Sequence, residues 1–428
     1  MSTTPDSPGL AGLTDLADEV DRRLAAADLA LASAYAGMPR GRQPVHTVYV
    51  PADRFDASTT RTWGRSAVEA LAANAGTDDE LAEAWCRSGD VDALRRQVLA
   101  KLTTEPIEDL RIDFEDGYGH RPDAEEDRAA ETAATALAEA IAAGSAGIAH
   151  GIRVKSLEPE TRVRSLRTLE LFVATLARRG ASLDGLVTTL PKVTSTEQVA
   201  AFAYVLSRLE AALDLPPGVL RFELQVETPE SVLGAGGNAP LAPMIRAGEG
   251  RVTGLHYGTY DYSAAFGVAP HLQSTEHPVA DHAKAVMQVA AAGTGVFVSD
   301  GSSNVLPVGS PDEVRSAWRL HARLVRRSLA AGIPQGWDLH PAQLVSRYAA
   351  TYAFFRDGLP EAAQRLRAAT SKDEGGFLDE PATVRAMTSF LVRGLDCGAL
   401  GAGEVEELSG LSPDGIRALA RPRAGGSA

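Results

Sequence analysis

The sequence predicts a (β/α)8 TIM barrel with N-terminal helical additions and a C-terminal helical arm. The first reason is that eight short apolar segments alternate with longer segments of helical pattern, as consecutive β-α units do. The apolar segments lie at residues 46–51, 109–116, 146–156, 185–193, 221–228, 252–261, 296–301 and 336–341. Helical patterns separate them, for example at 124–143, 196–214 and 311–331.

The second reason is that nearly every apolar segment ends in polar or charged residues. These are Asp53, Arg54, Asp113, Glu115, Asp116, Arg153, Lys155, Lys192, Glu227, Asp261, Asp300 and His340. Barrel enzymes build their sites from side chains at the carboxyl ends of several strands. A doubly wound open sheet gives the same alternation of strands and helices, but this supply of polar strand ends favours the barrel.

The chain divides into four predicted parts. Residues 1–45 form an N-terminal helical extension, since 12–35 is rich in Ala and Leu. Residues 46–345 form the barrel, with a helical insertion at about 57–106 that contains an N-cap candidate at Asp90. Residues 346–420 form a C-terminal helical arm, and 421–428 form a disordered tail.

Composition excludes several classes of function. The formal net charge of −14 and the lack of a basic cluster argue against nucleic acid as a partner. No stretch approaches the roughly 18 apolar residues of a membrane span, and the first residues do not resemble a signal peptide. Cys86 and Cys397 are the two cysteines and lie in no CxxC motif. We therefore expect a soluble, cytoplasmic protein.

Two carboxylates at consecutive strand ends predict a metal site. Glu227 shares one strand face with Glu223 and Gln225 by the period of two, and Asp261 closes the next apolar segment. Neighbouring barrel strands bring such carboxylates together, and oxygen ligands suit Mg²⁺. The alternative is that each acid caps the helix that follows it.

The segment "RIDFEDGYG" places Asp113, Glu115 and Asp116 at the end of a buried strand. Like charges this close resist burial unless a cation or hydrogen bonds compensate them. We expect some of them to lie near the metal and orient its ligands. The alternative is ion pairing with nearby arginines, which we expect for at least one of the three acids. These arginines are Arg111, Arg121 and Arg128.

Two basic strand ends are candidates for substrate binding. Arg153 carries a planar fork that suits two-point binding of a carboxylate, although a structural ion pair is the commoner role of such an arginine. Lys192 has the residue type of a Schiff-base nucleophile. With a metal site beside it, an electrostatic or packing role is favoured for Lys192.

Taken together, these segments resemble the citrate lyase beta-subunit-like group of the HpcH/HpaI aldolase and malate synthase superfamily. The similar motifs, in chain order, are "HTVYVPADRF", "DFEDGYG", "GIRVKS", "LPKV", "LQVETPESV", "YGTYDYSAAFG", "VFVSDG" and "GWDLHPAQL". The resemblance runs from about residue 46 to 395. Each motif is weak alone, but eight motifs in the correct order are specific.

The resemblance implies a fold, a metal and a set of site residues. It makes Glu227 and Asp261 the ligands of Mg²⁺, with Mn²⁺ as the alternative ion. It makes Arg153 the clamp for a substrate carboxylate and places Glu115 and Asp116 in support near the metal. The expected partner is a small-molecule keto acid or an acyl-CoA, although no coenzyme A pocket is identifiable.

The resemblance also implies an oligomer. "GGFLDEPATVRA" resembles a segment that, in related lyases, reaches into a neighbouring subunit's site with a catalytic aspartate, here Asp379. The alternative is that Asp379 caps the helix that begins at Pro381. The implied activity is carbon–carbon bond cleavage or formation through an enolate of a 2-keto or hydroxy acid, or its CoA thioester. The alternative is a non-catalytic barrel that binds a metal and a keto acid, as a regulatory subunit would.

Overall fold

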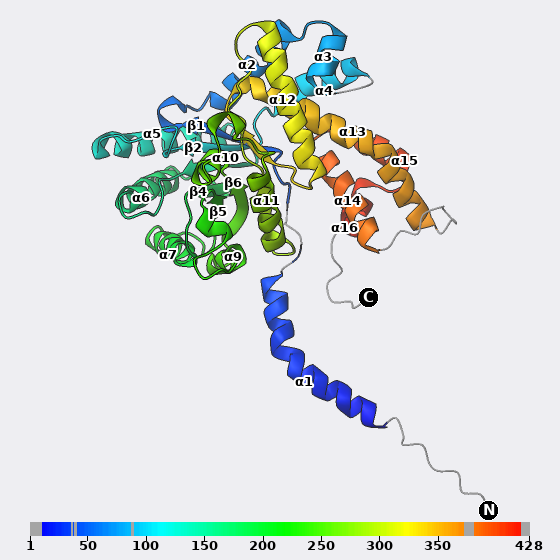
Figure 1. Cartoon of the computed structure of the whole chain (residues 1–428). Coiled ribbons are helices and arrows are strands. Elements are labelled where there is room, and N and C mark those ends of the chain that lie inside the picture. The colour runs from blue at the N-terminus through cyan, green and yellow to red at the C-terminus, as the bar shows by residue number, and fades with distance from the viewer. Residues whose placement is uncertain (1–10, 36, 38–40, 87–89, 372–380, 421–428) are drawn as a thin grey trace, which may run out of the picture.

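The computed structural model describes residues 11–35, 37, 41–86, 90–371 and 381–420, and its centre is a sheet of eight parallel strands (Figure 1). The strands are β1 (His46–Pro51), β2 (Asp109–Asp113), β3 (Ala149–Arg153), β4 (Leu186–Leu190), β5 (Arg221–Val226), β6 (Val252–Tyr257), β7 (Phe297–Ser299) and β8 (Gly336–Asp338). Their order in the sheet is β7-β6-β5-β4-β3-β2-β1-β8. All eight lie within the apolar segments predicted from the sequence.

The sheet curves until its two edge strands meet. A parallel bridge joins Ser299 of β7 to Gln335, the residue before β8. The backbone N–H of Asp300 donates to the carbonyl of Gln335 at 2.8 Å, and that of Trp337 donates to Gly301 at 3.2 Å. The strands therefore form a nearly closed barrel, and the predicted fold class is confirmed.

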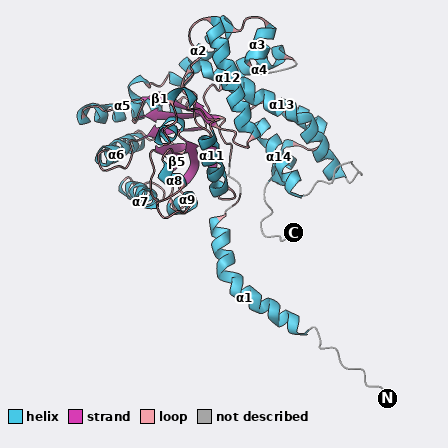
Figure 2. Cartoon of the chain, viewed as in Figure 1, coloured by secondary structure: helices cyan, strands magenta, loops and turns pink. Residues whose placement is uncertain are grey.

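Helices surround the barrel (Figure 2). Their bounds are α1 (Ala11–Ala34), α2 (Thr59–Asn74), α3 (Asp78–Ala84), α4 (Val91–Thr104), α5 (Asp123–Ala142), α6 (Arg162–Arg178), α7 (Thr196–Ala212), α8 (Pro229–Val232), α9 (Leu241–Ala247), α10 (Thr259–Ala265), α11 (Pro278–Ala291), α12 (Pro311–Ala330), α13 (Pro341–Ser371), α14 (Pro381–Asp396), α15 (Ala402–Ser409) and α16 (Pro413–Ala420). Short 3-10 helices lie at η1 (Ala52–Arg54) and η2 (Pro270–Leu272).

Side-chain caps fix where several helices begin. Thr77 and Glu80 form a capping box at the start of α3, and Ser310 and Glu313 form another at the start of α12. Asp90, the predicted N-cap, accepts the backbone N–H of Ala93 at 2.8 Å at the start of α4. Each cap satisfies a backbone donor that the first helical turn leaves unpaired, and is typically worth about 1 kcal/mol.

The segment between β1 and β2 contains α2, α3 and α4, in agreement with the helical pattern at 57–106. Helix α13 packs against α2, α4, α12 and α14, so it joins the barrel to the C-terminal helices. It passes without a break through residue 346, where we predicted that the arm begins. The predicted domain bounds remain predictions. Residues 421–428 and Asp379 lie outside the described residues.

Helix α1 projects from the rest of the molecule, at the lower end of the view in Figure 1. In the described part of the chain, no helix has both the length and the apolar composition that crossing a membrane requires.

Seven of the eight strands end before the end of the predicted apolar segment, and for β2 and β6 the difference affects the site. Strand β2 ends at Asp113 because its carboxylate accepts the backbone N–H groups of Glu115 at 2.9 Å and Gly117 at 2.8 Å, which turns the chain. Strand β6 ends at Tyr257, and Asp261 lies in the first turn of α10. Asp261 is therefore presented by a helix that begins at the strand end, and not by the strand itself.

Candidate active site

A cavity of about 360 Å³ opens at the carboxyl ends of the strands. Four predicted site residues line it, namely Asp116, Arg153, Glu227 and Asp261. The other lining residues are Tyr49, Pro51, Arg54, Asp113, Gly117, Gln225, Gly258, Thr259, Tyr260, Ser302, Trp337 and Leu339. These residues come from seven of the eight strands or the segments that follow them, as expected for a barrel site.

Lys192, which follows β4, contacts all four of the predicted metal-site acids. Its Nζ lies 3.3 Å from Oδ1 of Asp116, 3.3 Å from Oδ2 of Asp261, and in contact with Glu115. Its backbone N–H donates to Oε1 of Glu227 at 2.8 Å. Lys192 has a φ of 51°, which is uncommon outside glycine, so this geometry is held by its contacts.

The electrostatic surroundings of Lys192 favour its charged form. Burial acts to lower the pKa of the amine, but the Glu115 and Glu227 carboxylates outweigh it and raise the pKa above its usual value. A Schiff-base nucleophile requires a neutral amine, which these surroundings oppose. The structure therefore favours an electrostatic role for Lys192 over the role of a Schiff-base nucleophile.

Arg153, the last residue of β3, is committed mainly to Asp113. Its Nε and Nη2 donate to Oδ1 and Oδ2 of Asp113 at 2.7 and 2.6 Å, a bidentate pair. Its Nη1 lies 3.3 Å from Oε2 of Glu115 and 3.4 Å from Oε1 of Gln225. The guanidinium also lies over the ring of Tyr49, 4.9 Å from the centroid. The Nη1 edge, whose contacts are longer, is the part of Arg153 least committed to protein partners.

The ion pairs expected for the acids after β2 form with different partners. Asp113 does have a structural role, but its partner is Arg153 and not one of the three arginines that we expected. Arg111 pairs instead with Asp109 and Glu223 inside the barrel. In the described part of the chain, no ion pair joins the acids at 113, 115 and 116 to the expected arginines. The expectation was wrong because it considered only neighbours in sequence.

Glu227 is nearly fully buried, at 3% exposure. Its second carboxylate oxygen, Oε2, accepts a hydrogen bond from the amide of Gln225. Burial, against the opposing effect of Lys192, raises the pKa of Glu227 to about 8. Space here is tight, because a Cβ at position 258, a glycine in the chain, would lie 2.4 Å from Cβ of Glu227.

The acids around the cavity exceed the cations. The carboxylates are Asp113, Glu115, Asp116, Glu227 and Asp261, and the cations are Arg54, Arg153 and Lys192. Five acids minus three cations leave two formal negative charges when all are ionised. Among the described residues, no group of three or more His, Cys, Asp or Glu side chains is already arranged to hold a metal ion. A hard cation that takes one or two carboxylates and keeps several waters nevertheless fits this oxygen-rich, negatively charged cavity.

Arg54 is a lining residue whose role the sequence did not indicate. It lies in η1 directly after β1 and is exposed. Within the described part of the chain, no ion pair involves its guanidinium, whereas its neighbour Asp53 pairs with Arg121 at 3.2 Å. The only sequence signal was its place at a strand end, which it shares with many other polar residues.

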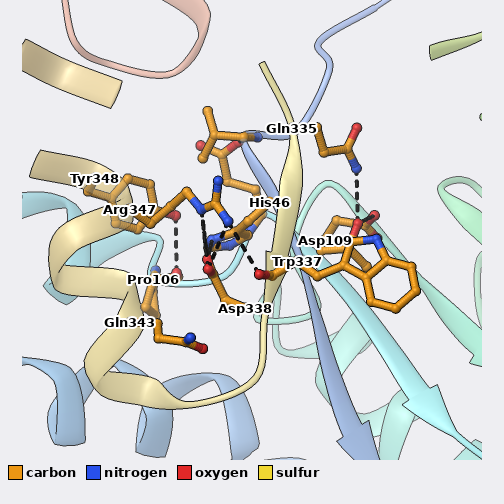
Figure 3. A network of polar contacts seen from close by, with 12 residues as sticks. His46, Pro106, Asp109, Gln335, Trp337, Asp338, Gln343, Arg347 and Tyr348 are labelled. Carbon is orange, nitrogen blue, oxygen red and sulfur yellow. Dashed lines mark hydrogen bonds and ion pairs between the residues drawn. The ribbon is translucent and has the colours of Figure 1, made fainter. Parts of the chain in front are cut away.

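A second cluster of charges lies between β8 and the helices α12 and α13 (Figure 3). Asp338 is fully buried and accepts hydrogen bonds from Nδ1 of His46 at 3.0 Å and Nη2 of Arg347 at 3.0 Å. Nε2 of His321 lies 3.2 Å from Oδ1 of Asp338, the oxygen that Nη2 of Arg347 also contacts. Burial acts to raise the pKa of Asp338, but Arg347 and the two histidines outweigh it and hold the pKa well below its usual value.

The fold and the cavity define a (β/α)8 barrel with an acidic site at the carboxyl ends of its strands. The chain belongs to the family described as a domain of unknown function, DUF6986, whose model matches residues 24–424. No curated protein sequence matches the chain.

Several solved structures share the fold. A citrate lyase from Burkholderia xenovorans LB400 is 20% identical, with a TM-score of 0.54, over 75% of this chain and 94% of that chain. A Haloferax volcanii malate synthase at 3 mM glyoxylate is 16% identical, with a TM-score of 0.50, over 85% of this chain and 88% of that one. The same malate synthase in a magnesium and glyoxylate complex is 16% identical, with a TM-score of 0.50, over 89% and 98%. The predicted resemblance to this superfamily is thus supported at the level of the fold.

Proposed function

We propose that this protein is a Mg²⁺-dependent carbon–carbon lyase or aldolase that acts through an enolate on a 2-keto or hydroxy acid, or on its CoA thioester. The observation that carries the proposal is the group of four carboxylates around Lys192 at the mouth of the barrel. The fold shared with a citrate lyase and with a malate synthase that binds magnesium and glyoxylate supports it.

Glu227 and Asp261 would hold Mg²⁺, or Mn²⁺ as the alternative, with Glu115 and Asp116 beside them. When bound, the ion supplies a Lewis acid for the carboxylate and adjacent oxygen of the substrate. Gln225 donates to Glu227 and fixes the direction of its carboxylate. Lys192 holds the other three acids around one point and partly offsets their repulsion.

Two arginines are assigned to the acid end of the substrate. Arg153 would use its Nη1 edge, which has longer contacts with Glu115 and Gln225, because Asp113 holds the rest of its guanidinium. Arg54 is exposed and lines the same cavity, so it offers a whole guanidinium fork for two-point binding of a carboxylate. We assign substrate binding to both, with Arg54 as the larger contributor.

In the cleavage direction, a carboxylate base takes the proton of the substrate hydroxyl. The hydroxyl carbon becomes a carbonyl, and the electron pair of the broken carbon–carbon bond remains on the second fragment as an enolate. Protonation of that carbon completes the reaction, and synthesis is the reverse. Asp116 lines the cavity with a side chain 61% exposed and is placed to move a proton. Asp379 of a neighbouring subunit is the other candidate.

Proton NMR of pyruvate and oxaloacetate in D₂O tests the enolate directly. We expect loss of the methyl or methylene proton signal that requires both protein and Mg²⁺, exceeds protein-free controls and is absent with Glu227→Gln. Acetyl-CoA in the same assay tests the thioester version. If none of the three compounds exchanges, the enolate proposal is wrong. Mg²⁺-dependent binding of a keto acid without exchange would then identify the non-catalytic binding barrel.

A further inference from the structure

Helix α1 exposes large apolar side chains that nothing in the described structure covers. Val20, Leu24 and Leu31 are 49%, 48% and 60% exposed, on a helix that projects from the barrel (Figure 1). Leaving such surface in water is unfavourable, in proportion to the apolar area that could be buried. These side chains of α1 therefore favour contact with another apolar surface.

Seven apolar residues of α1 follow a heptad pattern, and two further leucines, Leu16 and Leu29, lie outside it. Positions alternate in steps of four and three through Leu13, Ala17, Val20, Leu24, Ala27, Leu31 and Ala34. The charged residues of the helix all lie at other positions, namely Asp15, Asp18, Glu19, Asp21, Arg22, Arg23 and Asp28. An uninterrupted seam of this spacing is typical of a helix that pairs with another helix in a left-handed coiled coil. An amphipathic helix lying on its own barrel would show contacts to it, whereas this one projects.

We propose that α1 pairs in parallel with α1 of a second copy of this chain, forming a short two-stranded coiled coil. With Ala17, Leu24 and Leu31 at position a, Arg23 occupies g and Asp28 occupies e. In a parallel pair, g of one helix faces the e position five residues later in the other. Arg23 therefore meets Asp28 of the partner subunit, twice by symmetry. An antiparallel pair would instead bring the acids Asp21 and Asp28 together, so charge favours the parallel arrangement.

The base of α1 is anchored at the end of the barrel opposite the cavity. The backbone N–H of Gly37 donates to the carbonyl of Gly293 at 2.9 Å, and Gly37 bridges Thr294. Thr294 precedes the first residue of β7, whereas the cavity lies at the carboxyl ends of the strands. Pairing through α1 therefore leaves the cavity mouth open. The inference is independent of the proposed function, and either can fail alone.

Cysteine cross-linking of the full chain tests the pairing and its direction. In a Cys86→Ser background, Ala27→Cys places a thiol at the seam and should give a disulfide-linked species of twice 45.0 kDa on non-reducing gels. Leu29→Cys is the matched control, because Leu29 lies outside the seam and is more exposed, at 73%. Equal cross-linking of both variants, or none of either, would overturn the proposal. Cross-linking only when Ala27→Cys is mixed with Leu24→Cys would identify an antiparallel pair and overturn it as well.

Sedimentation equilibrium measures the dissociation constant of the same pairing. The double variant Leu24→Glu, Leu31→Glu should raise the dissociation constant of self-association at least tenfold, whereas Leu29→Glu should leave it near the wild-type value. Arg23→Asp should weaken association about tenfold, and adding Asp28→Arg should restore it. Circular dichroism confirms that each variant is folded. A wild-type chain that stays monomeric at 100 µM, or a Leu29→Glu effect as large as that of the seam variant, would overturn the proposal.

Discussion

The charges at the barrel mouth and those around Asp338 are both brought together by the fold, yet they differ in balance and in access to solvent. Asp338 is fully buried, meets the Arg347 guanidinium and two histidines, and has a depressed pKa. The mouth holds five acids against three cations beside a cavity, and the side chain of Asp261 is 45% exposed there.

This difference separates a structural cluster from a candidate site. A buried charge is tolerated when each group is paired and hydrogen-bonded, as Asp338 is. An acidic cluster with too few cations lowers stability unless something else binds there, and such perturbed groups gather at functional sites. Breaking the first cluster should therefore reduce stability, whereas breaking the second should reduce ligand binding and activity.

The largest expected effect on stability is that of Asp338→Asn. Removing this carboxylate leaves Arg347 buried without its counter-ion, which typically costs about 3–5 kcal/mol. Urea unfolding should show the loss, and Asp261→Asn, at the mouth, serves as the control and should change stability by less than about 1 kcal/mol. Similar losses of stability in the two variants would show that the Asp338 cluster is not more important for folding than the charges at the barrel mouth.

The acid dependence of stability provides a further test of the same residue. Because the folded pKa of Asp338 is well below the usual 3.8, its contribution is present above that value and is lost as the pH falls through the folded pKa. The stability difference between wild type and Asp338→Asn should therefore be constant above about pH 5 and shrink below pH 4. A difference that grows on acidification would contradict this assignment.

The largest expected effect on activity is that of Glu227→Gln. Loss of groups that merely orient a metal ligand costs about 10–100-fold, so loss of a ligand should lower turnover at least about 100-fold. Unfolding should be little affected, because glutamine keeps one oxygen to accept the Lys192 N–H. If the variant shows turnover close to that of the wild type in the Mg²⁺-dependent exchange assay, the assignment of Glu227 as a metal ligand is wrong.

Divalent cations should raise the folding stability by binding at the barrel mouth, and the Asp338 cluster should take no part in this effect. At one hundred times its dissociation constant, Mg²⁺ or Mn²⁺ should add about 2.7 kcal/mol to folding stability. A melting curve with and without the cation measures the shift, which Asp338→Asn should retain and a Glu227→Gln, Asp261→Asn double variant should lose. A shift of equal size in that double variant would place the cation elsewhere.

The smallest expected effect is that of Arg54→Ala. An unpaired surface arginine contributes little to folding, so stability should be unchanged, while the KM for the acid substrate should rise about tenfold. Arg121→Ala is the matched control, because Arg121 is a nearby exposed arginine that pairs with Asp53 and does not line the cavity. An equal rise in KM for both variants would indicate a general charge effect.

Much of the fold could be predicted from the sequence, because strand and helix patterns are local. The eight apolar segments contain all eight strands, and the cap at Asp90 lies where its residue type predicts. Of the twelve polar residues named at the strand ends, six line the cavity. Whether Glu227 and Asp261 bind a metal remains a prediction, and the assignment of Asp379 concerns a residue outside the described part of the chain.

By itself, the sequence determined the alternation of strands and helices and the concentration of acids at the strand ends. Only the tertiary structure decided which charges meet. Asp113 and Arg153 are partners because the register of β2 and β3 sets them side by side, although 40 positions separate them in sequence. Lys192 reaches four acids because its left-handed backbone turns both its N–H and its ammonium toward them. Such contacts depend on strand register and backbone direction between distant segments, and local patterns carry no information about either.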